Sequence, residues 1–340
     1  MVCDTRISAA MTTPVLEAQM NTRCFFAIIA ISSALAACTN MAVESAPKKQ
    51  TATQRSDAAI KADALFWDTL HNGEYEKIQN ALEVLTAAYL NTPNDSITAG
   101  HIGMLHFWRI TERNRLTQIP ASITDDIVVA RKYLQESVTL NPSDARYQGF
   151  LGGAMAIEGT IHHDEKLVRR GYYTLLDSAK AWPEFNLFTY GYVMSLQPAD
   201  SPRFKEGLEW QWLTLDKCIE GKVDRQSVDY SAYKVIQASE GVKRVCGNSW
   251  IAPHNIEGFF LNMGDMLVKS GDWKTAQQIY AGARLSPGYT TWKFRPVLED
   301  RIKDAQKNVA LYNAPKDLGL KQEPQMMVNS AFACTACHQS

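Results

Sequence analysis

The sequence lacks any marked excess of charge. Its 35 Lys and Arg residues almost balance its 36 Asp and Glu residues, which leaves a formal net charge of −1 at pH 7. Nucleic-acid-binding proteins usually carry a basic stripe, so this composition does not indicate a nucleic-acid partner. The chain also lacks a glycine-rich phosphate loop and a Gly-x-Ser-x-Gly nucleophile elbow, which argues against nucleotide hydrolysis and serine-hydrolase chemistry.

Long apolar runs are scarce, and the run near the N-terminus is too short to cross a membrane. It extends from Cys24 to Leu35, follows Arg23 and ends in small residues. This arrangement is typical of a secretory signal peptide, because a membrane-spanning helix needs about 20 apolar residues. Met20 is a plausible true start, since the residues before it include acidic side chains that suit a signal poorly. We therefore expect residues 1–37 to be a signal peptide and the protein to be exported.

The signal ends in the residues LAAC at 35–38, which resemble the lipobox of bacterial lipoproteins. The resemblance implies cleavage before Cys38 and acylation of its thiol, whereas an ordinary signal cut nearby is the alternative. Thr39 stands where such lipoproteins carry an Asp when they stay in the inner membrane, so the outer membrane is favoured. Residues 38–57, polar and non-periodic after the cysteine, are expected to be the lipidated cysteine and a flexible tether.

Strict alternation of polar and apolar residues, which marks a half-buried strand, is rare in the chain. Instead, residues 259–287 combine small and large side chains at helical spacing. Gly271 permits a turn between two helices, and Pro287 stops the second helix. The small positions are Gly264, Ala276 and Ala283, and the large ones are Phe260, Met263, Leu267, Trp273 and Tyr280. This unit resembles a tetratricopeptide repeat, which implies two closely packed helices.

Looser units of the same kind precede it. Their helical patterns end at Pro93, Pro142 and Pro183. Insertions are expected at 112–124, 159–168 and 198–208. A last helix, with Pro296 in its first turn, is expected to cap the array. We therefore predict an all-α fold, an irregular tetratricopeptide-like α-solenoid over residues 58–312, with a linker and a terminal segment at 313–340.

Cysteine is scarce as well, and most of the seven cysteines have an expected place. Cys3 and Cys24 precede the cleavage site, Cys38 takes lipid, and two cysteines lie in the last ten residues. Cys218 and Cys246 remain, and an exported protein is in an oxidising compartment. We predict a disulfide between them, which loop closure makes worth about 3–4 kcal/mol. Two separate buried thiols are the alternative.

The chain finishes with ACTACHQS, in which Cys334, Cys337 and His338 have the spacing Cys-x-x-Cys-His and are called the terminal motif below. This spacing is the attachment signature of c-type haem. The resemblance to c-type cytochromes implies one haem c, bound covalently by Cys334 and Cys337, with His338 as the proximal iron ligand. It covers five residues, so the cytochrome fold is not implied. Because only Gln339 and Ser340 follow, we expect the concave face or C-terminal end of the solenoid to enclose the haem.

Three other arrangements could use the same cysteines. A thioredoxin-type dithiol needs the motif at the start of a helix after a strand, and the chain offers no such βαβ setting. A zinc site needs a second pair of ligands at short spacing, which Cys218 and Cys246 do not supply. A plain disulfide between Cys334 and Cys337 in a haem-free protein is the third alternative.

The sixth ligand of the iron is left open by the sequence. His254 ranks first, because it precedes an expected helix whose N-terminus disfavours a charged imidazole. His163 and His162 come next, in an expected insertion that could reach across a groove, and Met327 follows them. A five-coordinate iron with an open side is also possible. The ligand decides the chemistry, since methionine raises the reduction potential and an open side admits small ligands.

Other residues near these candidates have expected places in the fold. His101 and His106 lie in an aromatic helix as core or groove-lining residues, and His71 is expected at the surface beside a turn. Ser330 is expected to cap the short helix of the terminal motif. The aromatic residues that could enclose the haem, or equally belong to the ordinary core, are Phe332, Trp250, Trp273 and Trp292.

Together these features predict a lipid-anchored periplasmic protein with one haem, which transfers electrons and docks a redox partner on its solenoid. We expect an electron carrier or binding protein in preference to an autonomous enzyme. The rival is a tetratricopeptide-like scaffold lipoprotein in which the haem is structural, sensory or absent. An exposed haem edge beside a docking face would favour the carrier, and a buried haem would favour the scaffold.

Overall fold

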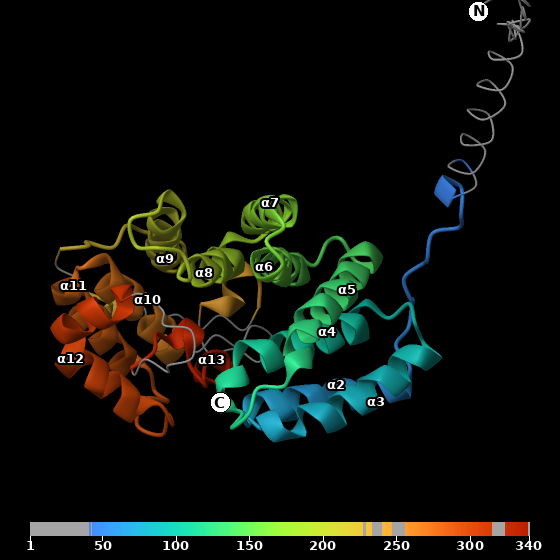
Figure 1. The fold of residues 1–340 in the computed structure, drawn as a ribbon, viewed down its shortest axis with the longest axis horizontal. Coiled ribbons are helices and arrows are strands. Elements are labelled where there is room, and N and C mark those ends of the chain that lie inside the picture. The colour runs from blue at the N-terminus through green and yellow to red at the C-terminus, as the bar shows by residue number, and fades with distance from the viewer. Residues whose placement is uncertain are drawn as a thin grey trace, which may run out of the picture. The chain divides into compact units, whose positions relative to one another are not determined.

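The computed structural model describes residues 41, 43–226, 229–232, 240–246, 256–314 and 324–338, so the expected lipidation site Cys38 lies outside the described residues. The chain divides into two units, Met1–Lys49 and Gln50–Ser340. In the second unit the described residues form α-helices and short 3-10 helices, and no strand (Figure 1). The prediction of an all-α fold is confirmed. Among these residues, no helix combines the length and apolarity that crossing a membrane requires.

Consecutive helices of this unit pack side by side in pairs. The pairs are α2 (Asp57–His71) with α3 (Ile78–Asn91), α4 (Ser96–Thr111) with α5 (Asp125–Leu140), α6 (Ala145–Ile161) with α7 (Glu165–Ala181), α8 (Pro183–Met194) with α9 (Pro202–Ile219), and α10 (Ile256–Ser270) with α11 (Trp273–Gly282). The last helix, α12 (Arg295–Asn313), packs on both α10 and α11. Successive pairs also contact each other, which gives the helical array of an α-solenoid.

The α10–α11 pair agrees with the tetratricopeptide-like pattern of residues 259–287. A Cβ atom added to Gly264 would lie 2.2 Å from the ring of Tyr280, so only glycine lets the two helices approach this closely. Gly271 has a φ of +94°, which a glycine adopts easily. The side chain of Asp272 then accepts the backbone N–H of Thr275 and caps α11.

The prolines mark helix ends as expected, but two of the three expected insertions do not exist. The stretch 159–168 contains only a tight turn between α6 and α7, in which Asp164 accepts the backbone N–H of Leu167 and caps α7. The stretch 198–208 is largely the first part of α9, which begins at Pro202. Only 112–124 is a longer connection, with the 3-10 helices η2 (Arg113–Arg115) and η3 (Ala121–Thr124).

The predicted disulfide is present. Cys218 at the end of α9 is bonded to Cys246, with the two Cα atoms 5.5 Å apart, a separation within the normal range for such bonds. Both residues are buried against the main core. The bond therefore ties the end of α9 to residues 240–246, which precede the last helix pair.

The terminal segment, residues 324–338, folds back into the helical array. It contains η7 (Met327–Asn329) and a single turn of helix, α13 (Thr335–His338). Figure 1 shows α13 between the first and last helix pairs, and α13 contacts both α2 and α10. The terminal motif thus lies inside the solenoid, next to helices that are far from it in sequence.

Candidate functional site

A buried carboxylate holds the N-terminal end of α13. The side chain of Glu112, at the end of α4, is fully buried and accepts the backbone N–H groups of Cys334 and Thr335 at 2.7 Å each. Glu112 also pairs with Arg115 at 2.7 Å. Ser330, the expected cap, donates to the carbonyl of Met327 and accepts the backbone N–H of Phe332, which precedes α13. Glu112 and not Ser330 therefore caps α13, so the cap predicted at Ser330 was wrong.

Four further side chains bind the backbone of the segment around the motif. Arg115 donates to the carbonyl of Ala331 at 2.7 Å, and Asn114 donates to that of Asn329 at 2.9 Å. On the other side, the Tyr192 hydroxyl donates to the carbonyl of Ala333 at 2.9 Å, and the indole N–H of Trp292 donates to that of Ala336 at 3.2 Å. The segment is therefore fixed from η2, from α8 and from the chain before α12.

A buried charged network holds the start of the segment. The Asp265 carboxylate of α10 accepts the backbone N–H of Met327 at 2.7 Å and the Tyr280 hydroxyl at 2.6 Å. It also lies 3.2 Å from the Arg301 guanidinium, which binds the carbonyl of Gln325. Asp265 and Arg301 are both buried, so their charges are not hydrated by water. The ion pair and the hydrogen bonds to the backbone of the segment replace that hydration.

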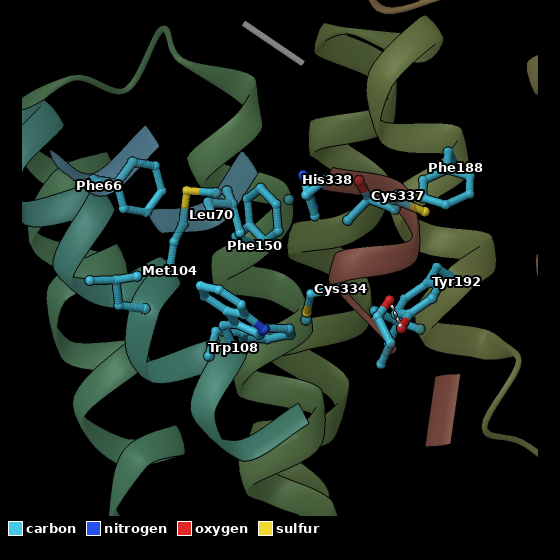
Figure 2. A pocket seen from close by; sticks show the side chains of 17 residues that line it. Phe66, Leu70, Met104, Trp108, Phe150, Phe188, Tyr192, Cys334, Cys337 and His338 are labelled. Atoms are coloured by element: carbon cyan, nitrogen blue, oxygen red, sulfur yellow. Dashed lines mark hydrogen bonds between the residues drawn. The ribbon is translucent and has the colours of Figure 1, made fainter. Parts of the chain in front are cut away.

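The terminal motif forms one wall of an apolar cavity with about 60 Å³ of free space (Figure 2). The other walls come from α2, α4, α6 and α8. The side chains and backbone that line it are Phe66, Leu70, Met104, Leu105, Phe107, Trp108, Gly149, Phe150, Gly153, Phe188, Thr189, Tyr192, Val193, Ala333, Cys334, Cys337 and His338. The lining is that of a site for a mainly apolar ligand.

Both cysteines of the motif are free thiols in this structure. Figure 2 shows Cys334 beside Trp108 and Cys337 beside Phe188. Burial raises the pKa of the Cys334 thiol, and it raises that of Cys337 well above the usual value. Catalytic dithiols need a lowered thiol pKa, because the thiolate is the nucleophile. The environment of the motif is therefore unlike that of a redox dithiol.

His338 is 8% exposed and lines a smaller hollow as well as the main cavity. The smaller hollow is lined also by Trp67, His101, Met104, Arg146, Tyr147, Phe150 and Phe185. His71, expected at the surface, is in fact buried at the end of α2, and its pKa is lowered by burial against an opposing hydrogen bond with the backbone of His338. The expectation of an exposed His71 was wrong because α13 covers this end of α2.

The structure does not bring three of the expected sixth ligands, His162, His163 and Met327, to His338. His162 and His163 are exposed in the turn after α6. Met327 is fully buried against α10 and does not line the cavity. His254 lies outside the described residues. Met104, which sequence reasoning missed, lines both hollows, and its helical spacing of four from Trp108 was the available signal.

Only some of the other expected residues lie at the site. His101 is buried, stacks on Phe66 and lies 2.7 Å from the Asp63 carboxylate, as expected for a core or groove-lining residue. His106 pairs with Asp126 at 2.6 Å, away from the cavity. Of the four aromatic residues expected near the haem, Trp250 lies outside the described residues, whereas Phe332, Trp273 and Trp292 do not line the cavity.

The cavity carries the functional groups that haem c requires. Haem c needs two thiols for its vinyl groups, an imidazole for its iron and apolar surroundings. The terminal motif supplies the thiols and the imidazole, and α2, α4, α6 and α8 supply the apolar side chains. Among the described residues, no three His, Cys, Asp or Glu side chains gather in a way that would hold a metal ion by themselves.

The chain was compared with protein-family models, with curated proteins and with solved structures. The chain matches no protein-family model, no curated protein and no solved structure. The functional assignment therefore depends on the residues and contacts described above.

Proposed function

We propose that this protein is a c-type cytochrome-like electron carrier with one haem. Cys334 and Cys337 hold the haem covalently, and His338 is the proximal iron ligand. The observation that carries the proposal is the position of the terminal motif, which forms part of the wall of an apolar cavity inside the helical array.

The chain's own residues have distinct tasks in this proposal. When bound, haem c supplies a one-electron iron couple. The aromatic and aliphatic walls exclude water, while Glu112, Tyr192 and Trp292 fix the backbone of the motif. His71 contacts the backbone of His338 and helps to set the position of that imidazole. Exclusion of water and fixed ligand geometry are two of the means by which a protein sets a haem's potential.

The location follows from the signal and the lipobox-like residues in the first part of the chain. Acylation of Cys38 would anchor the protein to the periplasmic face of the cell envelope, with the outer membrane favoured by Thr39. The polar residues after it would act as a tether. The solenoid would then present its outer faces to a redox partner protein, which is the use that helical repeats commonly serve.

A second function has its own support. The terminal segment binds α2, η2, α8, α10 and α12, and so links both ends of the helical array. This arrangement suits a scaffold lipoprotein in which the haem is structural, since a group attached at this point would stabilise contacts between distant helices.

Electron exchange separates the two functions. Mature holoprotein, adsorbed on an electrode, should give a reversible one-electron wave and should be oxidised rapidly by a soluble redox protein after reduction with dithionite. A haem that exchanges electrons only after unfolding would contradict the carrier function and leave the scaffold. The electrode experiment and the reaction with the soluble redox protein should use the same holoprotein preparation, so that the haem content is the same in both.

A further inference from the structure

From the lining of the cavity, we infer that Met104 supplies the sixth ligand of the haem iron through its thioether sulfur. The inference rests on the proposed haem site and adds to it the residue that completes the iron's coordination. Of the candidates that the sequence suggested, His162, His163 and Met327 do not line the cavity, and His254 lies outside the described residues.

Position is the first argument. Met104 lies on α4 and lines both the main cavity and the smaller hollow, and His338 also lines both. In Figure 2, Met104 lies on the α4 side of the cavity and His338 on the terminal segment across from it. Met104 is half-buried. Met104 and His338 thus lie on facing sides of the same space.

The chemistry of the other lining residues is the second argument. Most are aromatic, aliphatic or glycine and have no atom that binds iron. The Tyr192 hydroxyl is committed to the carbonyl of Ala333 and lies on the motif's own side. His101 lies 2.7 Å from the Asp63 carboxylate and stacks on Phe66, so binding iron would break a buried pair.

The polar residues of the smaller hollow do not compete. Arg146 is a cation with no lone pair to give, and it pairs with Asp144 at 2.6 Å. Tyr147 is buried, and burial raises the pKa of its hydroxyl, so the phenolate that would bind iron is not available at neutral pH. Met104 remains as a neutral ligand that loses little hydration when it binds in an apolar site.

The ligand has a consequence for function. A thioether opposite an imidazole raises the reduction potential of a haem relative to two imidazoles. The apolar walls act in the same direction, because they disfavour the more highly charged ferric form. With Met104 as the ligand, we therefore expect a high reduction potential, so that the haem accepts electrons readily.

The test is the Met104→Leu variant of the mature holoprotein, expressed with the c-type maturation machinery. Leucine keeps most of the volume and apolarity, so the fold should persist. The matched control is Met194→Leu, at a buried methionine of α8 that does not line the cavity. Met327→Leu tests the earlier candidate in the same way. All three are compared with wild type by haem stain, by the far-red charge-transfer band of thioether-ligated ferric haem, and by midpoint potential.

The expected result is that wild type and both controls show the band, whereas Met104→Leu keeps its covalent haem, loses the band, binds carbon monoxide more readily and shifts to a lower potential. A band that survives in Met104→Leu overturns the inference, and its loss in Met327→Leu instead assigns the ligand to that residue. A wild-type spectrum of two nitrogen ligands also overturns it, while the haem site stands. A protein without covalent haem overturns both.

Discussion

Glu112 is the side chain on which the docking of the terminal motif depends most. Its side chain is fully buried. Its oxygens accept the backbone N–H groups of Cys334 and Thr335, which are more than 200 residues away in sequence. A buried carboxylate is tolerated only where charge-assisted hydrogen bonds replace its hydration. The segment and Arg115 provide those bonds.

Replacing this carboxylate should loosen the motif. Glu112→Gln removes the charge but keeps the shape, so we expect a loss of about 1.5–3 kcal/mol in the free energy of unfolding, the worth of hydrogen bonds to a charged group. Faster amide hydrogen exchange at residues 334–338 should accompany it. The control is Glu165→Gln, an exposed residue paired with Arg169, which should change stability little. Equal effects at the two positions would contradict the role given to Glu112.

Two buried histidines make stability depend on pH. Burial lowers the pKa of His71 and of His101, in each case against an opposing hydrogen bond. The unfolded chain binds protons below about pH 6.5 while the folded chain keeps both rings neutral. Stability should therefore fall as pH drops from about 6.5 toward the lower folded-state pKa values, and should be fully present above pH 7. Urea unfolding between pH 8 and pH 5 measures this slope.

His71→Gln isolates one of the two contributions. The variant cannot take up a proton at this position, so its stability should fall less steeply with decreasing pH than that of wild type. A slope identical to wild type would show that His71 does not contribute. His101 is less suitable for this purpose, because its contact with Asp63 would also be lost.

The packing of α13 on α10 depends on a glycine. A Cβ atom on Gly258 would lie 2.6 Å from the Cys337 sulfur and 2.8 Å from the carbonyl of Ala336. Gly258→Ala should therefore push α13 away, lower the yield of covalent haem and cost about 1–3 kcal/mol, as overpacking does. Gly221→Ala is the control, because an added Cβ there meets nothing closer than 3.8 Å. Unchanged haem content and stability in Gly258→Ala would contradict this packing.

The disulfide between α9 and residues 240–246 should be a substantial source of stability. Its two cysteines are 28 residues apart in sequence, and the loop-closure model gives about 3–4 kcal/mol for such a loop. The Cys218→Ser/Cys246→Ser protein should unfold at correspondingly lower urea concentration. Because neither cysteine lines the cavity, haem content per folded molecule should be unchanged, and a colourless variant would show that the two regions depend on each other.

Local pattern predicted the helices, and long-range contacts explain what it missed. Small residues at fixed spacing, such as Gly264 and Ala276, reveal a close helix pair, and a proline marks a helix end, because both effects act within a few residues. The turn at His162–Asp164 was mistaken for an insertion because its polar residues resemble a loop, although Asp164 is a helix cap. Pattern within one segment could not show that Glu112 caps α13.

The same limit applies to the site. The Cys-x-x-Cys-His spacing predicts haem attachment from the sequence alone, and this stays a prediction. The structure places Cys337 and His338 in α13 and Cys334 directly before it. Which helices surround them depends on how the chain returns into the array, so Met104 was missed, whereas His162 and His163 were expected there but lie on the surface. The predicted disulfide succeeded because few other cysteines were left to pair.

Across the second unit as a whole, the terminal segment joins helices from the first pair to the last, so the docking of the motif should be coupled to the stability of the array. Attachment of an apolar group in the cavity would fill space between α2, α4, α6 and α8. We therefore expect the mature holoprotein to unfold at a higher temperature than the Cys334→Ala/Cys337→Ala protein, in differential scanning calorimetry at equal concentration. Equal unfolding temperatures for the two proteins would show that the cavity does not hold the haem.

The most direct measurement is the absorption spectrum of the exported protein, first oxidised and then reduced with dithionite, followed by haem stain after denaturing electrophoresis. The account predicts a sharp reduced α-band of the c type, and a stain that migrates with the protein and disappears in Cys334→Ala/Cys337→Ala. A colourless protein from a host with intact c-type maturation would contradict it, and the terminal motif would then belong to a haem-free scaffold.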